Sequence, residues 1–132
     1  MVYNLFISHS WTYSDSFIKL VAILNSNSYF NYKSHSVPKN DPRHHARYDS
    51  QLKEAIKSKM RPACCVLILS GVYATYGKWI NLEIELAREM GKPIIAVEPW
   101  GAESTSAAVK NAADKIVGWN TYSIISAIRE CC

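Results

Sequence analysis

The 132-residue sequence has no long apolar run, and this absence excludes several classes of protein. No stretch reaches the roughly 18 consecutive apolar residues that a membrane-spanning helix needs, so we expect no membrane partner. The first residues, MVYNLFISHS, lack a basic segment followed by a long apolar core and a small-residue cleavage site. The default expectation is therefore a cytoplasmic protein.

The four cysteines form no recognisable metal motif. They occur as two adjacent pairs, Cys64-Cys65 and Cys131-Cys132, without CxxC spacing or a histidine at zinc-finger distance. The first pair lies in an apolar run, where a free cysteine behaves as a small hydrophobic residue. The second pair ends the sequence and is expected to be frayed. We therefore expect neither a metal site nor a disulfide.

The net charge of +4 is modest, and it comes partly from one local basic cluster. The cluster comprises Lys33, Lys39, Arg43, His44, His45 and Arg47. A solvated basic loop accounts for it, and a site for an anionic ligand is the alternative. Because no nucleic-acid-binding motif accompanies the cluster, we expect no nucleic-acid partner.

Apolar patterning divides the chain into five strand–helix units. The predicted strands are 2–8, 29–35, 63–70, 93–99 and 114–119. Three predicted helices have clear ranges: 14–26, 78–90 and a short one at 105–113. Another helix is marked by Tyr48, Leu52, Ala55, Ile56 and Met60. A last helix is capped by Thr121 and has Tyr122, Ile125 and Ile128 along one side. Residues 36–46 are a loop by composition.

This alternation predicts a single α/β domain spanning residues 1–132. Strands that alternate with helices form a parallel sheet covered by helices on both faces, which gives three layers. Residues 63–70, ACCVLILS, are apolar without alternation, as in a strand buried on both sides. Five such units predict the flavodoxin-like strand order 2-1-3-4-5.

Ligands in such sheets bind beyond the carboxyl ends of the strands, beside the first strand. The loops expected there are 8–11, 36–46 and 70–77. The third predicted helix begins directly after the last of these loops, and Gly91 suits its C-terminal cap. Residues early in this helix are therefore candidates for contact with a ligand.

A glutamate stands in the middle of the apolar face of this third helix. At about 100° per residue with Trp79 at zero, Glu83 falls at about 40°, whereas Glu85 falls at about 240° on the polar side. The apolar arc contains Trp79, Ile80, Leu82, Leu86, Ala87 and Met90. A buried carboxylate without a partner is costly, so Glu83 either forms a structural ion pair beneath the helix or serves chemistry.

Several segments together resemble a Toll/interleukin-1 receptor (TIR) domain. They are FISHSW after the first strand, SVPKNDP after the second, SGVYATYGKWINLEIELA with its W-x-x-x-E, and GKPIIAV in the fourth strand. The resemblance covers essentially the whole chain in order. It is strongest to the small bacterial TIR-like proteins of the Thoeris anti-phage defence type.

The resemblance implies one of two activities. Some TIR domains are adaptors that only assemble with other TIR domains. Others break the bond between nicotinamide and ribose in NAD and release ADP-ribose or a cyclic form of it, which in Thoeris-type systems signals to a separate effector protein. NAD is then a substrate, and neither a cofactor nor a metal is implied. The catalytic glutamate of such enzymes lies four residues after the tryptophan, which is Glu83 after Trp79.

A single carboxylate suffices for this reaction, because nicotinamide departs neutral and needs no proton. Glu83 would orient the ribose and stabilise its oxocarbenium-like charge, while burial and the nearby helix N-terminus would shift the pKa of its carboxyl in opposite directions. The candidate substrate-binding residues are Ser8, His9, Trp11, Asp41, Arg43, Tyr76 and Trp79.

Several of these candidates have a simpler alternative. Trp79 packs against the nicotinamide or ribose, or belongs to the core; Arg43 meets the pyrophosphate, or is solvated. Asp41 more readily supports a turn than touches ribose. The loop after the first strand lacks the paired basic residues of some TIR domains, which leaves the phosphate contacts open.

Three other classes of function compete with the enzyme. A non-catalytic TIR module would self-associate through residues 36–46 and its helix surfaces. A response-regulator receiver is disfavoured because no acidic pair follows the first strand and no strand ends in a phosphate-accepting aspartate. A flavodoxin is disfavoured because the first loop lacks a phosphate-binding Thr/Ser/Gly sequence.

Overall fold

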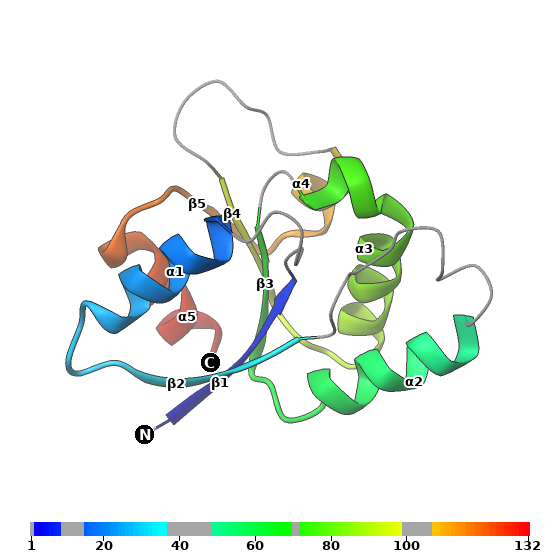
Figure 1. Cartoon of the computed structure of the whole chain (residues 1–132), viewed down its shortest axis with the longest axis horizontal. Helices are drawn as coiled ribbons and strands as arrows, with labels where there is room; N and C mark the ends of the chain where they lie inside the picture. The colour runs from blue at the N-terminus through cyan, green and yellow to red at the C-terminus, as the bar shows by residue number, and fades with distance from the viewer. Residues whose placement is uncertain (1, 9–14, 37–48, 70–71, 99–106) are drawn as a thin grey trace.

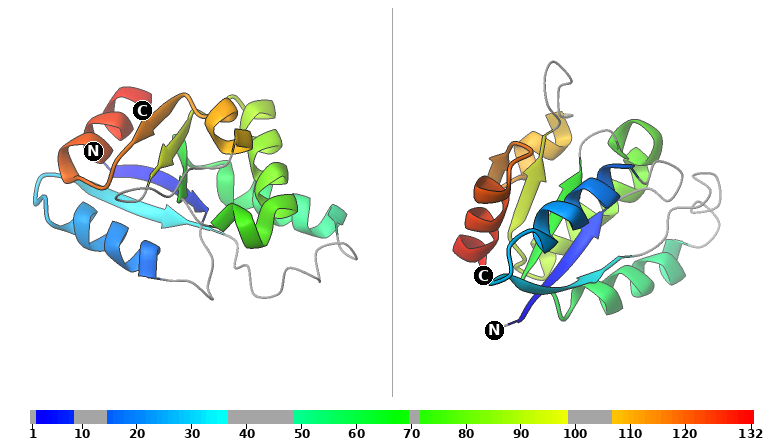
Figure 2. Two further views of the ribbon diagram at one scale, coloured as in Figure 1. Left: turned by 90° about the horizontal axis from the view of Figure 1, so that it is seen from above. Right: turned by 60° about the vertical axis from the view of Figure 1, so that its left-hand side comes forward.

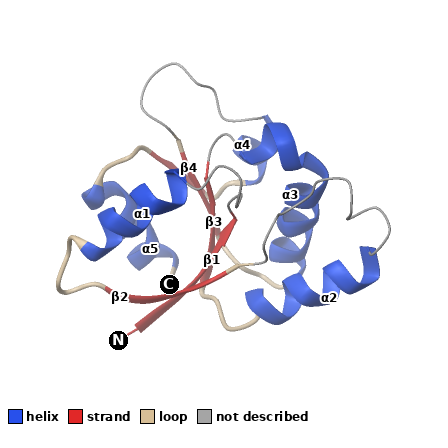
Figure 3. Cartoon of the chain, in the orientation of Figure 1, coloured by secondary structure: helices blue, strands red, loops and turns tan. Residues whose placement is uncertain are grey.

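Five parallel strands form one sheet in a computed structural model that describes residues 2–8, 15–36, 49–69, 72–98 and 107–132. Of these, the side chains of residues 15–16, 49, 72–76 and 78 lie outside the description. The strands are β1 (Val2–Ser8), β2 (Asn31–His35), β3 (Cys65–Leu69), β4 (Ile94–Val97) and β5 (Lys115–Val117). Their order is β2-β1-β3-β4-β5, which confirms the predicted topology. Figure 3 shows the strands in red between the blue helices.

Helices cover both faces of this sheet. They are α1 (Asp15–Asn25), α2 (Asp49–Met60), α3 (Val72–Glu89), α4 (Ala107–Ala112) and α5 (Thr121–Cys131). One face carries α1 and α5, and the other carries α2, α3 and α4, so the three predicted layers are present (Figures 1 and 2). None of the described helices combines the length and apolarity that a membrane crossing requires.

The central strands are the most buried part of the molecule. Every residue of β3 and β4 is buried, as the unbroken apolar runs predict, and the two strands pair from Val66 with Ile94 to Leu69 with Val97. The outer strand β2 exposes Asn31, Lys33 and Ser34, which fits the polar edge strand that its sequence suggests.

Helix α3 begins at Val72, six residues earlier than predicted. The sequence SGVYATYG looks like a loop because it contains two glycines and small polar residues. Gly77 nevertheless lies inside the helix. A glycine there disfavours a helix by only about 1 kcal/mol, which packing of the apolar face readily offsets. The predicted 70–77 loop is therefore wrong from residue 72 onward.

The end of α3 is confirmed by its backbone geometry. Gly91 has φ +69°, the left-handed conformation that glycine adopts without strain. The amide of Gly91 donates to the carbonyl of Arg88 at 3.1 Å, and that of Lys92 donates to the carbonyl of Ala87 at 2.8 Å. These two bonds form a Schellman motif, so the predicted glycine cap is present.

Helix α5 differs from its prediction in two respects. Its N-cap is Asn120, whose Oδ1 accepts a hydrogen bond from the amide of Ser123 at 2.7 Å, so Thr121 is the first helical residue. Its buried stripe consists of Ile124, Ile125, Ala127 and Ile128. Tyr122, assigned to the packed side, is 82% exposed. Ala55 of α2, likewise expected on an apolar face, is also exposed.

The cysteines overturn the expectation that no disulfide forms. Cys64 and Cys132 are joined by a disulfide, with their Cα atoms 5.4 Å apart and a separation of 68 positions in the sequence. Cys132 is the C-cap of α5, and its amide donates to the carbonyl of Ile128 at 2.9 Å. The end of the helix is therefore ordered rather than frayed, because α5 packs across the sheet and ends beside the start of β3.

Candidate functional site

A buried serine–glutamate pair joins the first strand to the third helix. The Ser8 hydroxyl donates a hydrogen bond of 2.7 Å to Oε1 of Glu83. Both residues are 0% exposed, and they are the buried polar or charged residues of the part of the chain that the structure describes. Sequence reasoning named both residues but did not predict that they bind each other.

Each partner is placed by the element that carries it. Ser8 is the last residue of β1 and pairs in register with Ile68 of β3, so its hydroxyl lies at the carboxyl end of the central strands. Glu83 projects from the inner face of α3, as the helical wheel predicts, because Ile80, Leu86 and Ala87 of that face are fully buried. Glu85, two residues on, is exposed as expected.

The distance of Glu83 from the start of its helix corrects one electrostatic expectation. Because α3 begins at Val72, Glu83 lies about three turns inside the helix rather than about one. The partial charge at a helix N-terminus acts mainly within the first turn. The N-terminus of α3 is therefore too far from Glu83 to act strongly on its carboxylate.

Trp79 lies one turn before Glu83 and belongs to the hydrophobic core. Its side chain is only 7% exposed and packs within the same cluster as Ile80 and Leu86. The alternative interpretation of Trp79 as a core residue therefore describes its place in this structure. Tyr76 is in α3, although its side chain is outside the description.

Four of the predicted substrate-binding residues lie outside the described residues. They are His9, Trp11, Asp41 and Arg43. Most residues of the basic cluster, and residues 37–46 of the predicted loop, also lie outside the described residues. Among the predicted site residues the structure therefore brings Ser8 and Glu83 into contact and places Trp79 one turn away on α3, and the functional role of every candidate stays a prediction.

The carboxylate of Glu83 is fully enclosed by the protein. A fully buried carboxylate loses the hydration that stabilises its charge, and hydrogen bonds from the protein must replace it. The Ser8 hydroxyl donates one such hydrogen bond. Enclosure also strengthens any attraction between this carboxylate and a positive charge placed beside it. The arrangement suits a site that binds a developing cation once it opens.

A surface pocket of about 300 Å³ lies away from this pair. It is lined by Arg88, Gly91, Lys92, Pro93 and Asp114, where α3 ends and β4 begins. Its polar groups already serve the fold: an Asp114 oxygen accepts from the Ile94 amide at 2.8 Å, and the Lys92 ammonium donates to the Arg61 carbonyl at 3.0 Å. This pocket is therefore best explained as a structural feature of the amino ends of the strands.

The fold and the buried glutamate on the third helix define this chain as a TIR-like domain. A family model described as the TIR-like domain of the Thoeris protein ThsB matches residues 6–104. Because the match covers most of the 132 residues, the chain belongs to that family. This membership places it among the TIR domains of anti-phage defence.

A crystal structure of a 3-dehydroquinate dehydratase-like protein from Bifidobacterium longum is similar at a TM-score of 0.48 and 12% sequence identity. The similarity covers 99% of this chain and 94% of that chain. No curated protein matches the sequence.

Proposed function

We propose that this TIR-like domain cleaves the bond between nicotinamide and ribose in NAD, with Glu83 as the catalytic carboxylate. The observation that carries the proposal is the Ser8–Glu83 hydrogen bond of 2.7 Å, which holds a fully buried carboxylate at the carboxyl end of β1. This is the end of a parallel sheet at which ligands bind. Family membership supports the same activity.

Cleavage of the bond between nicotinamide and ribose requires few protein groups besides the Glu83 carboxylate. The nicotinamide of NAD is cationic and leaves as a neutral molecule, taking the electron pair of the C–N bond. The ribose is left with oxocarbenium-like positive charge, which a fixed carboxylate in a poorly hydrated site stabilises strongly. Ser8 acts as a positioning residue, because its hydroxyl fixes the orientation of the Glu83 carboxylate.

The second step determines the product. Attack by water on the ribose carbon gives ADP-ribose and releases a proton. Attack by a nitrogen of the adenine ring gives a cyclic ADP-ribose. We propose the cyclic product, which a separate effector protein would bind as a signal, and we propose that copies of the domain self-associate through TIR surfaces. No resident cofactor or metal takes part in this scheme.

Because Glu83 is 0% exposed, substrate contact requires the site to open. The same enclosure favours a second candidate function. A glutamate that is sealed and hydrogen-bonded can serve the fold alone, in which case the domain is a non-catalytic module that assembles with other TIR domains. The two functions differ in whether replacing the Glu83 carboxylate changes NAD consumption while the fold stays intact.

The test compares Glu83→Gln with the wild type. Purified protein is incubated with NAD, nicotinamide release is measured by chromatography, and NAD is measured in phage-infected cells that express each variant. Glutamine keeps the size of the side chain and an oxygen that accepts from Ser8, so the fold should survive. We expect nicotinamide release to fall by at least about 100-fold, because the charge that stabilises the ribose cation is lost.

Glu85→Gln is the matched control, because Glu85 is exposed two residues away on the same helix. It should retain the wild-type rate. Unchanged NAD consumption by a folded Glu83→Gln protein, in the tube and in infected cells, would overturn the assignment of Glu83. Absence of NAD consumption by the wild type in both settings would favour the non-catalytic module.

A further inference from the structure

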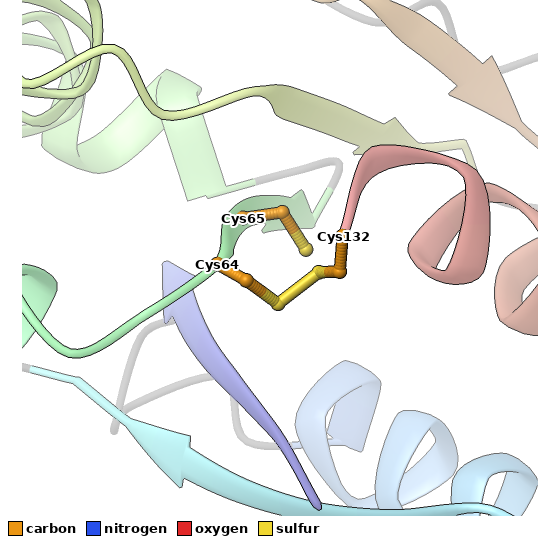
Figure 4. A group of neighbouring side chains, drawn as sticks. All are labelled: Cys64, Cys65 and Cys132. Carbon is orange, nitrogen blue, oxygen red and sulfur yellow. A yellow bond between two sulfur atoms is a disulfide. The ribbon is translucent and has the colours of Figure 1, made fainter. Parts of the chain in front are cut away.

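All four cysteines of the sequence lie where the amino end of β3 meets the end of α5. Cys64 and Cys65 stand at the start of β3, and Cys131 and Cys132 stand at the end of α5. The sulfur atoms of Cys64, Cys65 and Cys132 all lie within 4.8 Å of one another. Figure 4 shows the Cys65 side chain pointing toward the Cys64–Cys132 bond. Segments 68 residues apart thus place three sulfurs in one spot.

We propose that Cys64 and Cys132 form a reversible thiol–disulfide site, which small thiols and disulfides open and close. In the closed form the bond ties α5 to the centre of the sheet. In the open form the two residues are thiols. The site lies at the opposite end of the sheet from Ser8 and Glu83, so it adds a redox-dependent property that is independent of the proposed NAD chemistry.

The exposure of the cysteines determines which of them react. Cys132 is exposed and Cys64 is half-buried, so a small thiol reaches their bond from solvent. Cys65 is 0% exposed, and burial raises the pKa of its thiol to about 12. Since only the thiolate attacks a disulfide, Cys65 is almost unreactive at neutral pH although it lies beside the bond.

Cys131 is protected in a similar way, although less completely. It is half-buried, and burial is the main reason that the pKa of its thiol is raised. Neither Cys65 nor Cys131 therefore competes with Cys64 for Cys132. The pairing is fixed by the fold, and exchange is confined to one bond of the cluster.

The exchange is a balanced two-electron reaction with a low-molecular-weight thiol such as glutathione. A glutathione thiolate attacks Sγ of Cys132 and forms a mixed disulfide, while Cys64 leaves as a thiolate. A second glutathione thiolate attacks the glutathione sulfur of the mixed disulfide, which releases Cys132 as a thiolate and yields oxidised glutathione. Protons from solvent restore both thiols, and oxidised glutathione drives the reverse reaction.

The bond has a structural effect because of what it joins. Helix α5 packs on β4 and β5 and buries Ile124, Ile125, Ala127 and Ile128, whereas β3 is the centre of the sheet. Closing a long loop of chain restricts the unfolded state and so stabilises the folded one. Reduction should therefore lower the melting temperature of the domain by roughly 10 °C.

A soft metal ion is the alternative occupant of the three sulfurs. Thiolates are ligands of zinc and of similar ions, and three sulfurs within 4.8 Å of one another suit one ion. The Cys64–Cys132 bond excludes that state, because it uses two of the three sulfurs. We therefore argue for the disulfide, and metal binding becomes an outcome of the test.

The experiment equilibrates the full chain in buffers of varied reduced-to-oxidised glutathione ratio. Acid quenching, differential alkylation and peptide mass spectrometry then report the state of each cysteine, and metal content is measured in parallel. We expect Cys64 and Cys132 to oxidise together in one transition, while Cys65 and Cys131 stay reduced throughout. The melting temperature should follow the same transition.

Two serine variants keep the test decisive. Cys132→Ser should melt at the temperature of the reduced wild type and should no longer respond to reductant. Cys131→Ser, its neighbour on the same helix, should respond as the wild type does. The proposal is overturned if Cys64 and Cys132 stay reduced in every buffer, if Cys65 or Cys131 pairs in their place, if one metal ion per chain protects the thiols from alkylation, or if both variants behave alike.

Discussion

The two ends of the sheet are each tied to a helix by one long-range link, and the two links are of opposite kinds. At the carboxyl end, Ser8 of β1 and Glu83 of α3 are joined by a hydrogen bond across 75 residues of sequence. At the amino end, Cys64 beside β3 and Cys132 of α5 are joined by a covalent bond across 68 residues. The first link depends on the charge of the carboxylate and on the exclusion of water, whereas the second depends on the redox state of the two cysteines.

This difference separates the roles of the two ends. A buried carboxylate is an energetically unfavourable means of holding a helix on a sheet, because an apolar side chain of similar size stabilises a core at least as well. A disulfide stabilises a fold without placing any charge in the interior. The carboxyl end therefore suits the proposed NAD chemistry, and the amino end suits a cross-link that stabilises the fold.

Removing the Ser8 hydroxyl at the carboxyl end should destabilise the domain more than altering the C-cap at Gly91 or the N-cap at Asn120. Ser8→Ala leaves the buried Glu83 carboxylate without this donor, which should lower the free energy of unfolding by about 1.5–3 kcal/mol. Urea denaturation measures the loss. Ser34→Ala, on the exposed side of β2, is the control and should change stability by less than about 0.5 kcal/mol.

Combining Ser8→Ala with Cys132→Ser under oxidising conditions tests whether the two links stabilise the domain independently. The two links are at opposite ends of the sheet and share no partner, so their losses should add within about 0.5 kcal/mol. A large coupling between them would mean that the two ends are not independent, and the division of roles would fail.

The backbone conformation of Gly91, next to the amino end of the sheet, should make the second-largest contribution to the free energy of unfolding among these three sites. Gly91→Ala forces a side chain into the left-handed conformation at φ +69°, and should lower the free energy of unfolding by about 1–2 kcal/mol. Nothing lies within 4 Å of the added methyl group, so the loss comes from the backbone alone. Gly118→Ala has equally open space and no positive φ, and is the matched control. Equal losses in the two variants would contradict the assignment of the α3 cap.

The N-cap of α5 gives the smallest of the three effects. Asn120→Ala removes the acceptor for the Ser123 amide at the end of α5 that is remote from the disulfide, and should cost about 1 kcal/mol. Thr121→Ala should be nearly neutral, because Thr121 is helical. Both are measured by thermal unfolding with and without reductant. A larger effect of Thr121→Ala would restore the cap that the sequence suggested.

Much of the fold could be predicted from local patterns. The apolar run of β3 and the alternation of strands with helices are properties of neighbouring residues, and they determined the strand order. The errors share one cause. The start of α3 at Val72 and the cap at Asn120 depend on packing and on single hydrogen bonds, which small polar residues and glycines signal only weakly.

The candidate site was predicted in part for a related reason. The helical wheel placed Glu83 on the buried face because the period of a helix is fixed. It could not identify Ser8 as the partner, since a serine at the end of a strand is common and their contact spans 75 residues. The cysteine cluster was missed because adjacent pairs show no metal spacing, and only the packing of α5 reveals that they meet. Two cysteine pairs, one beside a central strand and one at a helix end, are the signal to look for.

The polar edge strand β2 limits how copies of this chain can meet. An edge strand with exposed Asn31, Lys33 and Ser34 places a charge where a second chain would have to add its own strand. At the far border β5 is only three residues long, and its Lys115 is paired with Glu130. Continuous sheets across molecules, and the fibrils that grow from them, are therefore disfavoured at both borders.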